Sequence, residues 1–180
     1  MFENSIDLLK EKGVVLDEGL SLEELNFIEK LYKIKFPQSL RMFLMLNVPI
    51  SNGFYNWRDT SKDNVEYVNK IIDLPFEGIF NKADEVYWSD SWGVEPDENI
   101  YLYSVREKLK KAPRLVPVYS HRYIPIIPEI NPPVLSIHGV DIICYGIDLE
   151  EYIDIEFGNK KQSSIQFDKV PYIDFWSEIM

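Results

Sequence analysis

The sequence has little of what disulfides, metal sites and cofactor sites require. Its 180 residues include one cysteine, Cys144, and two histidines, His121 and His138. A disulfide needs two cysteines and a structural zinc site needs four Cys or His ligands, so neither is expected. The eight glycines form neither GxGxxG nor GxxxxGKS/T, and no run of acids has the spacing of a calcium-binding loop. We therefore expect neither a metal nor a cofactor.

Positive charge and long apolar runs are also scarce. The chain has 19 basic against 30 acidic residues, a formal charge of −11, which opposes binding to nucleic acids and to anionic lipid surfaces. No apolar run approaches the roughly 20 residues that a helix needs to cross a bilayer. No basic segment followed by an apolar one opens the chain, as a secretory signal would require. We expect an acidic cytoplasmic protein that binds neither nucleic acid nor membrane.

Apolar side chains, by contrast, are plentiful. Hydrophobic residues make up 46% of the chain and aromatic residues 14%, which is enough to build a sizeable core. The chain contains no internal repeat and no linker long enough to divide it, so we expect a single domain over residues 1–180. Trp57 and Cys144 lie in apolar surroundings, and both are predicted to be buried structural residues.

Periodic apolar residues predict helices in the first two thirds of the chain. They fall at residues 6–13, 21–32, 37–47, 65–75 with one further turn at 76–80, and 97–111. Ser21 and Glu24 have the spacing of a capping box, and Pro37 suits the first turn of the next helix. Residues 49–60 contain the turn dipeptide Asn52-Gly53 and are predicted to hold a short strand or a buried loop.

The pattern changes to strands after residue 114. Short segments rich in branched and aromatic residues lie at 115–119, 123–127, 134–138 and 141–145. Residues 120–122 and 138–140 would connect them as two hairpins, the second through Gly139. Prolines around the second strand confine it to an edge of the sheet or to a short run. With a short helix between Asp148 and Gly158, and a closing helix at 172–179 carrying Trp176, we expect an α+β fold whose mostly antiparallel sheet has helices packed around it.

Two arrangements could support catalysis. Ser120 and His121 are adjacent, but neighbouring side chains on a strand point to opposite faces, and no nucleophile elbow is present. We interpret His121 as a turn residue rather than a general base. A hydrolase with a carboxylate pair would need two acidic side chains about 5 to 10 Å apart in one pocket. The sequence favours a protein that is not an enzyme.

The most unusual stretch of the chain is acidic and aromatic. Between Ala83 and Ser104 there are six acids and no base, interleaved with Tyr87 and two tryptophans. In one interpretation the acids solvate a connection while the tryptophans fill the core. In the other, the acids steer a basic protein partner toward the stretch and the tryptophans supply contact area. The candidate partner-binding residues are Asp84, Glu85, Trp88, Asp90, Trp92, Glu95, Asp97 and Glu98.

A second acidic run lies at residues 148–156, with five acids and no base. Residues 123–180 carry three bases against ten acids, a net charge of −7, so this part of the chain holds most of the negative charge. The second run is the alternative surface for binding a basic partner.

Three stretches of the chain share a pattern with a known family. The first, FPQSLRMFLMLNVPISNGFYNW, combines a proline, aliphatic residues at helical spacing, and a glycine followed by a tryptophan. The second is LVPVYSHRYIPIIPEINPPVLSIHGVDIICYGIDLEEYIDIEF, and the third is PYIDFWSEI. In this order they resemble the SUKH superfamily, which includes fungal regulators of cell-wall synthesis and bacterial immunity proteins of polymorphic toxin systems. The matching positions of the first stretch are Pro37, Leu40, Phe43, Leu44, Gly53 and Trp57.

The resemblance implies a SUKH-like α+β fold without catalytic apparatus. Immunity members of this family block a cognate toxin, frequently a nuclease, and partners are thought to bind the face and rim loops of the sheet. Residues 61–114 match no family motif, so no family role carries over to the acidic, aromatic stretch. We expect an immunity protein whose partner is a basic toxin domain. A regulatory scaffold or adaptor for an endogenous protein is the alternative, and a hydrolase is the third.

Overall fold

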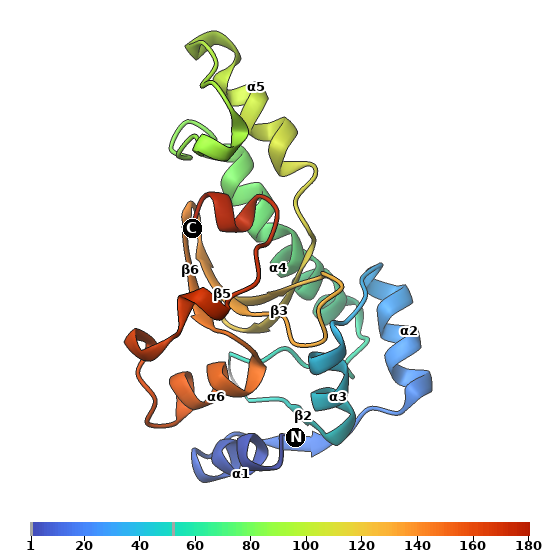
Figure 1. Cartoon of the computed structure of the whole chain (residues 1–180). Coiled ribbons are helices and arrows are strands. Elements are labelled where there is room, and N and C mark those ends of the chain that lie inside the picture. Colours follow the sequence, from blue (N-terminus) through green and yellow to red (C-terminus); the bar gives the residue numbers. More distant parts are fainter. Residues whose placement is uncertain (1, 52) are drawn as a thin grey trace.

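A computed structural model describes residues 2–51 and 53–180, so Asn52 of the predicted turn dipeptide lies outside the described residues. The helices are α1 (Glu3–Glu11), α2 (Leu22–Tyr32), α3 (Gln38–Leu46), α4 (Lys62–Asn81), α5 (Glu98–Leu109) and α6 (Leu149–Phe157) (Figure 1). The strands are β1 (Leu16–Glu18), β2 (Asn47–Pro49), β3 (Leu115–Tyr119), β4 (Arg122–Pro125), β5 (Val134–His138) and β6 (Asp141–Gly146). Single turns of 3-10 helix lie at Asp90–Trp92, Gln162–Ser164, Phe167–Lys169 and Trp176–Glu178. These elements confirm the predicted α+β class.

Strands β3 to β6 form one antiparallel sheet in the order β3-β4-β5-β6. Both predicted hairpins are present: Ser120 and His121 connect β3 to β4, and Gly139, with φ +63°, lies in the turn from β5 to β6. Strand β4 lies between β3 and β5 and not at an edge, but it is short and ends at Pro125, which has no N–H to donate. The prolines therefore limit the length of this strand rather than its position.

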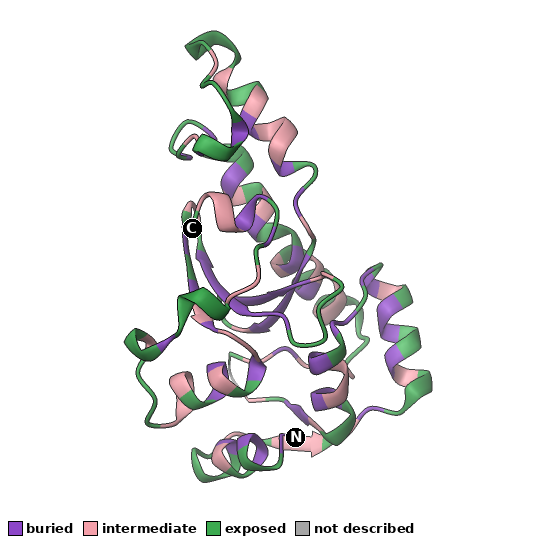
Figure 2. Ribbon diagram, in the orientation of Figure 1, coloured by how far each residue is buried: buried purple, intermediate pink, exposed green. Residues whose placement is uncertain are grey.

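The sheet separates two hydrophobic cores, because successive side chains on a strand point to opposite faces. Val116 and Ile124 belong to the first core, together with residues of α1, α2, α3 and α6. Leu115 and Tyr123 belong to the second core, with residues of α4, α5 and the C-terminal segment. In Figure 1 the sheet accordingly lies between a lower and an upper group of helices, and Figure 2 shows buried residues running through it.

Local signals mark the start of three helices. The Ser21 hydroxyl accepts the N–H of Glu24 at 3.1 Å, and the Glu24 carboxylate accepts the N–H of Ser21 at 2.7 Å, which completes the capping box of α2. Pro37 is the N-cap residue of α3. At the start of α6, Asp148 Oδ1 accepts the N–H of Glu151 at 2.8 Å. These side-chain bonds satisfy backbone donors that a helix start leaves free.

Helix α4 runs through Pro75, so the helix expected at 65–75 and the further turn at 76–80 form one helix of 20 residues. A proline inside a helix leaves the carbonyl four residues earlier without its N–H donor. That carbonyl belongs to Ile71, and the Tyr123 hydroxyl of β4 donates to it at 3.3 Å. A strand that is remote in sequence thus supplies the hydrogen bond that the proline removes.

Residues on both sides of the predicted turn dipeptide reach the first core, namely Val48 of β2 and, after Gly53, Tyr55 and Trp57. Strand β2 pairs with β1, a strand that the sequence analysis did not predict. Trp57 is 2% exposed, and its ring makes edge contacts with Tyr32 and Phe36 at centroid distances of 5.4 and 4.9 Å. Cys144 of β6 is also fully buried, and burial raises the pKa of its thiol. Both residues were predicted to be buried, and both predictions are confirmed.

The prediction of a closing helix at 172–179 is wrong. The helical turn in this segment covers Trp176–Glu178 alone, and the residue before it, Phe175, has a φ of +66°, which an α-helix does not allow. The segment is held by the second core instead. Phe175 stacks on Trp92 at a centroid distance of 5.7 Å, and the Trp176 indole N–H donates to the Pro113 carbonyl at 2.9 Å. Packing of two adjacent aromatic rings therefore overrides the apolar periodicity.

Candidate functional site

Residues 82–109, which we call the arm, project from the rest of the molecule at the upper end of Figure 1. The arm consists of the connection that follows α4 and of helix α5, which packs back against α4. Arg106 holds the two helices together. Its guanidinium lies 4.1 Å from the centre of the Phe80 ring and donates to the Phe80 carbonyl through Nε and Nη2 at 3.1 and 3.0 Å. This carbonyl lies in the last turn of α4, where a helix leaves its acceptors free.

Aromatic rings fill the inside of the arm. Trp88 and Trp92 meet edge to face at 5.1 Å, and the Trp88 indole N–H donates to the Gly93 carbonyl at 2.9 Å. The Tyr101 hydroxyl donates to the Val86 carbonyl at 2.7 Å. Trp92 is only 9% exposed and belongs to the second core. Trp92 therefore fills the core, as the first interpretation of the tryptophans holds, and it is removed from the candidate contact residues.

The six acids between residues 83 and 104 lie on the surface of the arm. Glu85 pairs with Lys82 at 3.0 Å. The side chains of the other five form no hydrogen bond or ion pair with any residue that the structure describes. These five are Asp84, Asp90, Glu95, Asp97 and Glu98. The fold does not use these charges, so they remain available to attract a basic ligand.

The arm also exposes apolar side chains that the sequence analysis did not single out as contact residues. Val94 is 95% exposed, Tyr87 67% and Tyr103 65%. Ile100 and Leu102 of α5 are exposed as well. Uncovered apolar groups gathered on a projecting element are typical of a surface that contacts another protein. The apolar positions of α5 do not share one helical face, and this was the signal in the sequence that could have indicated them.

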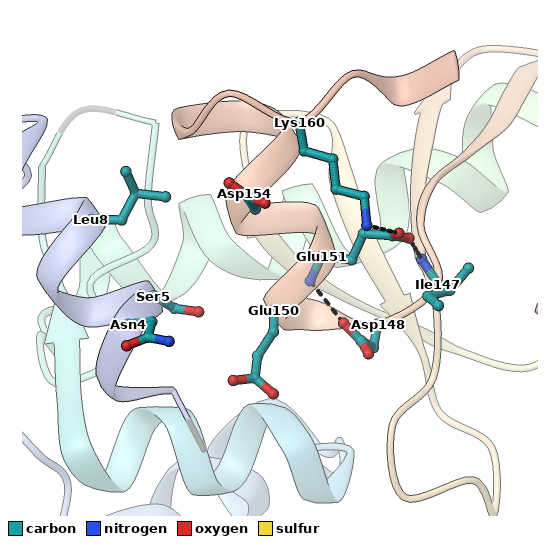
Figure 3. A pocket seen from close by; sticks show the side chains of 9 residues that line it. All are labelled: Asn4, Ser5, Leu8, Ile147, Asp148, Glu150, Glu151, Asp154 and Lys160. Carbon is teal, nitrogen blue, oxygen red and sulfur yellow. Dashed lines mark hydrogen bonds and ion pairs between the residues drawn. The ribbon is translucent and has the colours of Figure 1, made fainter. Parts of the chain in front are cut away.

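The second acidic run lies on α6 beside a hollow of about 490 Å³ between α1 and α6. Figure 3 shows four carboxylates of this run around the hollow, those of Asp148, Glu150, Glu151 and Asp154, with Lys160 reaching in from the segment after α6. Glu151 Oε1 pairs with Lys160 Nζ at 2.6 Å, and Glu151 Oε2 accepts the N–H of Ile147 at 2.7 Å. Glu150 accepts the N–H of Phe2 at 2.9 Å and so ties α6 to the start of α1. Most of the second run therefore stabilises the fold.

The same hollow is the place where a hydrolase with a carboxylate pair would hold its two acidic side chains. Asp148 is engaged as the N-cap of α6. Among the four acids around the hollow, Asp154 alone makes no hydrogen bond or ion pair with a described residue. The other three carboxylates are held by hydrogen bonds or an ion pair of the fold. The hydrolase hypothesis stays a prediction.

Ser120 and His121 contact each other, contrary to the sequence-based argument. Both lie in a turn, where the alternation of a strand does not apply, and Ser120 has a φ of +47°. Ser120 Oγ lies 3.2 Å from His121 Nδ1, while His121 Nε2 contacts Arg122 Nη1. Burial and the neighbouring Arg122 lower the pKa of His121, which makes its ring a weaker base. His121 lies in the turn between β3 and β4, as predicted.

Arg122 is a buried cation on the sheet. Its Nη2 lies 3.2 Å from Glu156 of α6, its Nη1 donates to Ser136 Oγ at 2.9 Å, and its guanidinium lies 4.1 Å from the centre of the Tyr145 ring. Removing one member of a buried ion pair leaves the other charge uncompensated. The pair with Glu156 thus fixes α6 on its face of the sheet.

Comparison of the chain with protein-family models, with curated proteins and with solved structures finds no match. The resemblance to the SUKH superfamily stays a prediction.

Within the described residues, no three His, Cys, Asp or Glu side chains gather as metal ligands would. None of the helices in the described part of the chain has the length and apolar character that spanning a bilayer takes. The arm, which combines free charges with exposed apolar groups, is the candidate site.

Proposed function

We propose that this chain is a non-enzymatic protein that binds a basic protein partner through the arm. One observation supports this above all: the arm exposes acidic and apolar side chains that the fold does not use. Tyr87, Val94 and Tyr103 would provide the apolar centre of the contact, and the free acids would surround it. Protein interfaces commonly combine an apolar centre with a polar rim in this way.

The charge of the arm suits a basic partner. Six acids without a base lie between residues 83 and 104 of a chain whose formal charge is −11. Because the arm projects, its charges would meet an approaching partner early. Complementary charge of this kind raises association rates by ~10 to 10³-fold at low salt. At ionic strengths near 0.1 M the effect is confined to about 10 Å, so it acts at the arm itself.

The resemblance to immunity proteins suggests what kind of protein this partner is. A nuclease toxin holds the phosphate backbone with basic residues, and an acidic arm is complementary to such a surface. Docked there, the chain would exclude the nucleic acid without any chemical step. We therefore infer an immunity function, in which a basic toxin domain is neutralised by occlusion of its active surface. The alternative is an adaptor whose arm binds an endogenous basic protein.

The test uses two variants of equal charge. Asp90, Glu95 and Asp97 are replaced together by lysine in the arm variant. The control variant carries lysine at Glu11, Glu23 and Asp168, which are exposed and make no hydrogen bond or ion pair with a described residue. Each triple substitution changes the formal charge from −11 to −5.

The immunity function requires a neighbouring gene for a large secreted protein with a variable C-terminal domain, and that domain is the probe. We expect the arm variant to bind it at least tenfold more slowly, and the control to stay within about threefold of the wild type. Equal slowing in both variants would contradict a specific role of the arm. Wild-type protein should also abolish the nuclease activity of the probe at equimolar ratio. Binding without inhibition would favour the adaptor over the immunity function.

A further inference from the structure

A second hollow, of about 330 Å³, lies where α4 passes the turns of both hairpins. Its floor is apolar and includes Pro75 of α4, Tyr123 of β4 and Ile137 of β5, while Leu74 forms part of its wall. Ligand pockets in proteins start at about 300 Å³ and have mainly apolar linings with a few polar groups. The hollow is therefore large enough for one ring-sized ligand.

The sequence explains why space remains here. Gly78 faces the hollow from α4 and has no side chain to fill it. A Cβ added at Gly78 would lie 3.4 Å from Cα of Gly139, so the helix and the turn approach closely at this point. A larger residue at position 78 would have to occupy the space beside Gly139, where both residues line the hollow.

Polar groups meet at the rim of the hollow. The His121 and His138 rings come from different turns and lie 6.2 Å apart, with an angle of 78° between their planes. Both ring nitrogens of His121 are engaged. The side chains of His138 and Asn81, in contrast, form no hydrogen bond with a described residue. Imidazole and amide groups can each donate and accept, so they match a hydroxyl.

A ligand that combines an apolar ring with a hydroxyl group, as a phenol does, would match this lining. We propose that the hollow binds a tyrosine side chain of the protein partner, an inference that rests on the proposed function. The rim residues Asn81 and Lys82 lie where the arm begins, so a partner bound to the arm would cover the hollow. Tyrosine is among the residues that most often anchor protein interfaces, because its ring is rigid and large and its hydroxyl is polar.

The first experiment probes the chain alone with p-cresol, the tyrosine side chain as a free molecule. The chain has two histidines, so their imidazole C–H signals in a proton NMR spectrum are easily resolved and assigned. At a fixed pH, p-cresol should shift the His138 signal saturably. We expect a dissociation constant on the order of millimolar, as small fragments show. Toluene lacks the hydroxyl and should bind at least threefold more weakly.

Two variants show where the probe binds. Gly78→Leu fills the hollow and should weaken p-cresol binding at least tenfold. Glu77→Leu places the same side chain at the neighbouring exposed position and should leave binding unchanged. If Gly78→Leu does not fold, Leu74→Ser is the substitute, because Leu74 is 45% exposed and its loss removes part of the wall. No saturable shift in the wild type, or equal binding by Gly78→Leu or by toluene, would overturn the proposal.

The second experiment separates this inference from the proposed function. With the toxin domain, Gly78→Leu should accelerate dissociation at least tenfold and leave association unchanged, whereas the arm variant should slow association. If the arm variant behaves as expected but Gly78→Leu dissociates like the wild type, the tyrosine site is refuted and the proposed function stands. If p-cresol binds but Gly78→Leu does not alter the complex, the hollow takes a free phenol, and the partner's tyrosine is excluded.

Discussion

Trp92 and Tyr103 lie on the same arm, but their truncation should affect different properties of the protein. Trp92 is 9% exposed and packs against Trp88 and Phe175, whereas Tyr103 is 65% exposed. Trp92→Ala should therefore lower stability, and Tyr103→Ala should weaken partner binding. The comparison decides which aromatic residues of the arm build the fold and which contact the partner.

The expected magnitudes are well separated. Truncation of a buried tryptophan costs ~3 to 5 kcal/mol, a large part of the ~5 to 15 kcal/mol by which domains are stable. For a chain of this length 1 kcal/mol corresponds to about 2 to 4 °C, so Trp92→Ala should lower Tm by about 6 to 20 °C. A substitution at an exposed site changes stability by ~0.5 kcal/mol or less. If Tyr103 is an interface anchor worth ~2 kcal/mol, its loss accelerates dissociation about thirtyfold.

Two measurements provide the test. Thermal denaturation followed by circular dichroism gives Tm for both variants, and surface plasmon resonance against the toxin domain gives the dissociation rate constants. The reasoning is refuted if Tyr103→Ala lowers Tm as much as Trp92→Ala does. It is also refuted if Tyr103→Ala, with its fold intact, dissociates at the wild-type rate.

Two further predictions concern the scaffold. Tyr123→Phe removes the hydroxyl that donates to Ile71 beside Pro75, and should cost about 1 kcal/mol. In a Pro75→Ala background, which restores the backbone N–H, the same substitution should cost less, and an equal loss of Tm in both backgrounds would contradict the account. Burial and the neighbouring Arg122 lower the pKa of His121, so the unfolded chain takes up this proton at higher pH than the folded one. The free energy of unfolding should fall as pH drops below about 6.5, and His121→Gln should flatten that decline; an unchanged profile in urea titrations would argue against it.

Elements defined by neighbouring residues could be predicted from the sequence. The capping box of Ser21 and Glu24 and the hairpin turn at Gly139 depend on a few adjacent residues, and the structure has both. The course of α4 through Pro75 and the positive-φ conformation of Phe175 depend on partners that are remote in the chain. No local pattern indicates such contacts, so these features could not be predicted.

The candidate site also has features that the sequence could predict and features that it could not. The excess of acids between residues 83 and 104 indicated a binding stretch, because an excess of one charge can be counted in the sequence. It could not show that most acids near α6 are engaged, as Glu151 is with Lys160, while five acids of the arm make no hydrogen bond or ion pair with a described residue. Nor could it show that Trp92 is buried and Tyr103 exposed, because packing of α5 against α4 decides which side of the helix is covered.

The central claim is that free charges on the arm, and not the net charge of the chain, attract the partner. The most direct test is the association rate constant of the toxin domain with the wild type, the arm variant and the control variant, measured at low and at physiological salt. The account predicts that the arm variant loses both its fast association and most of its salt dependence, while the control keeps both. Equal association rate constants and salt dependence in the two triple-lysine variants would contradict it.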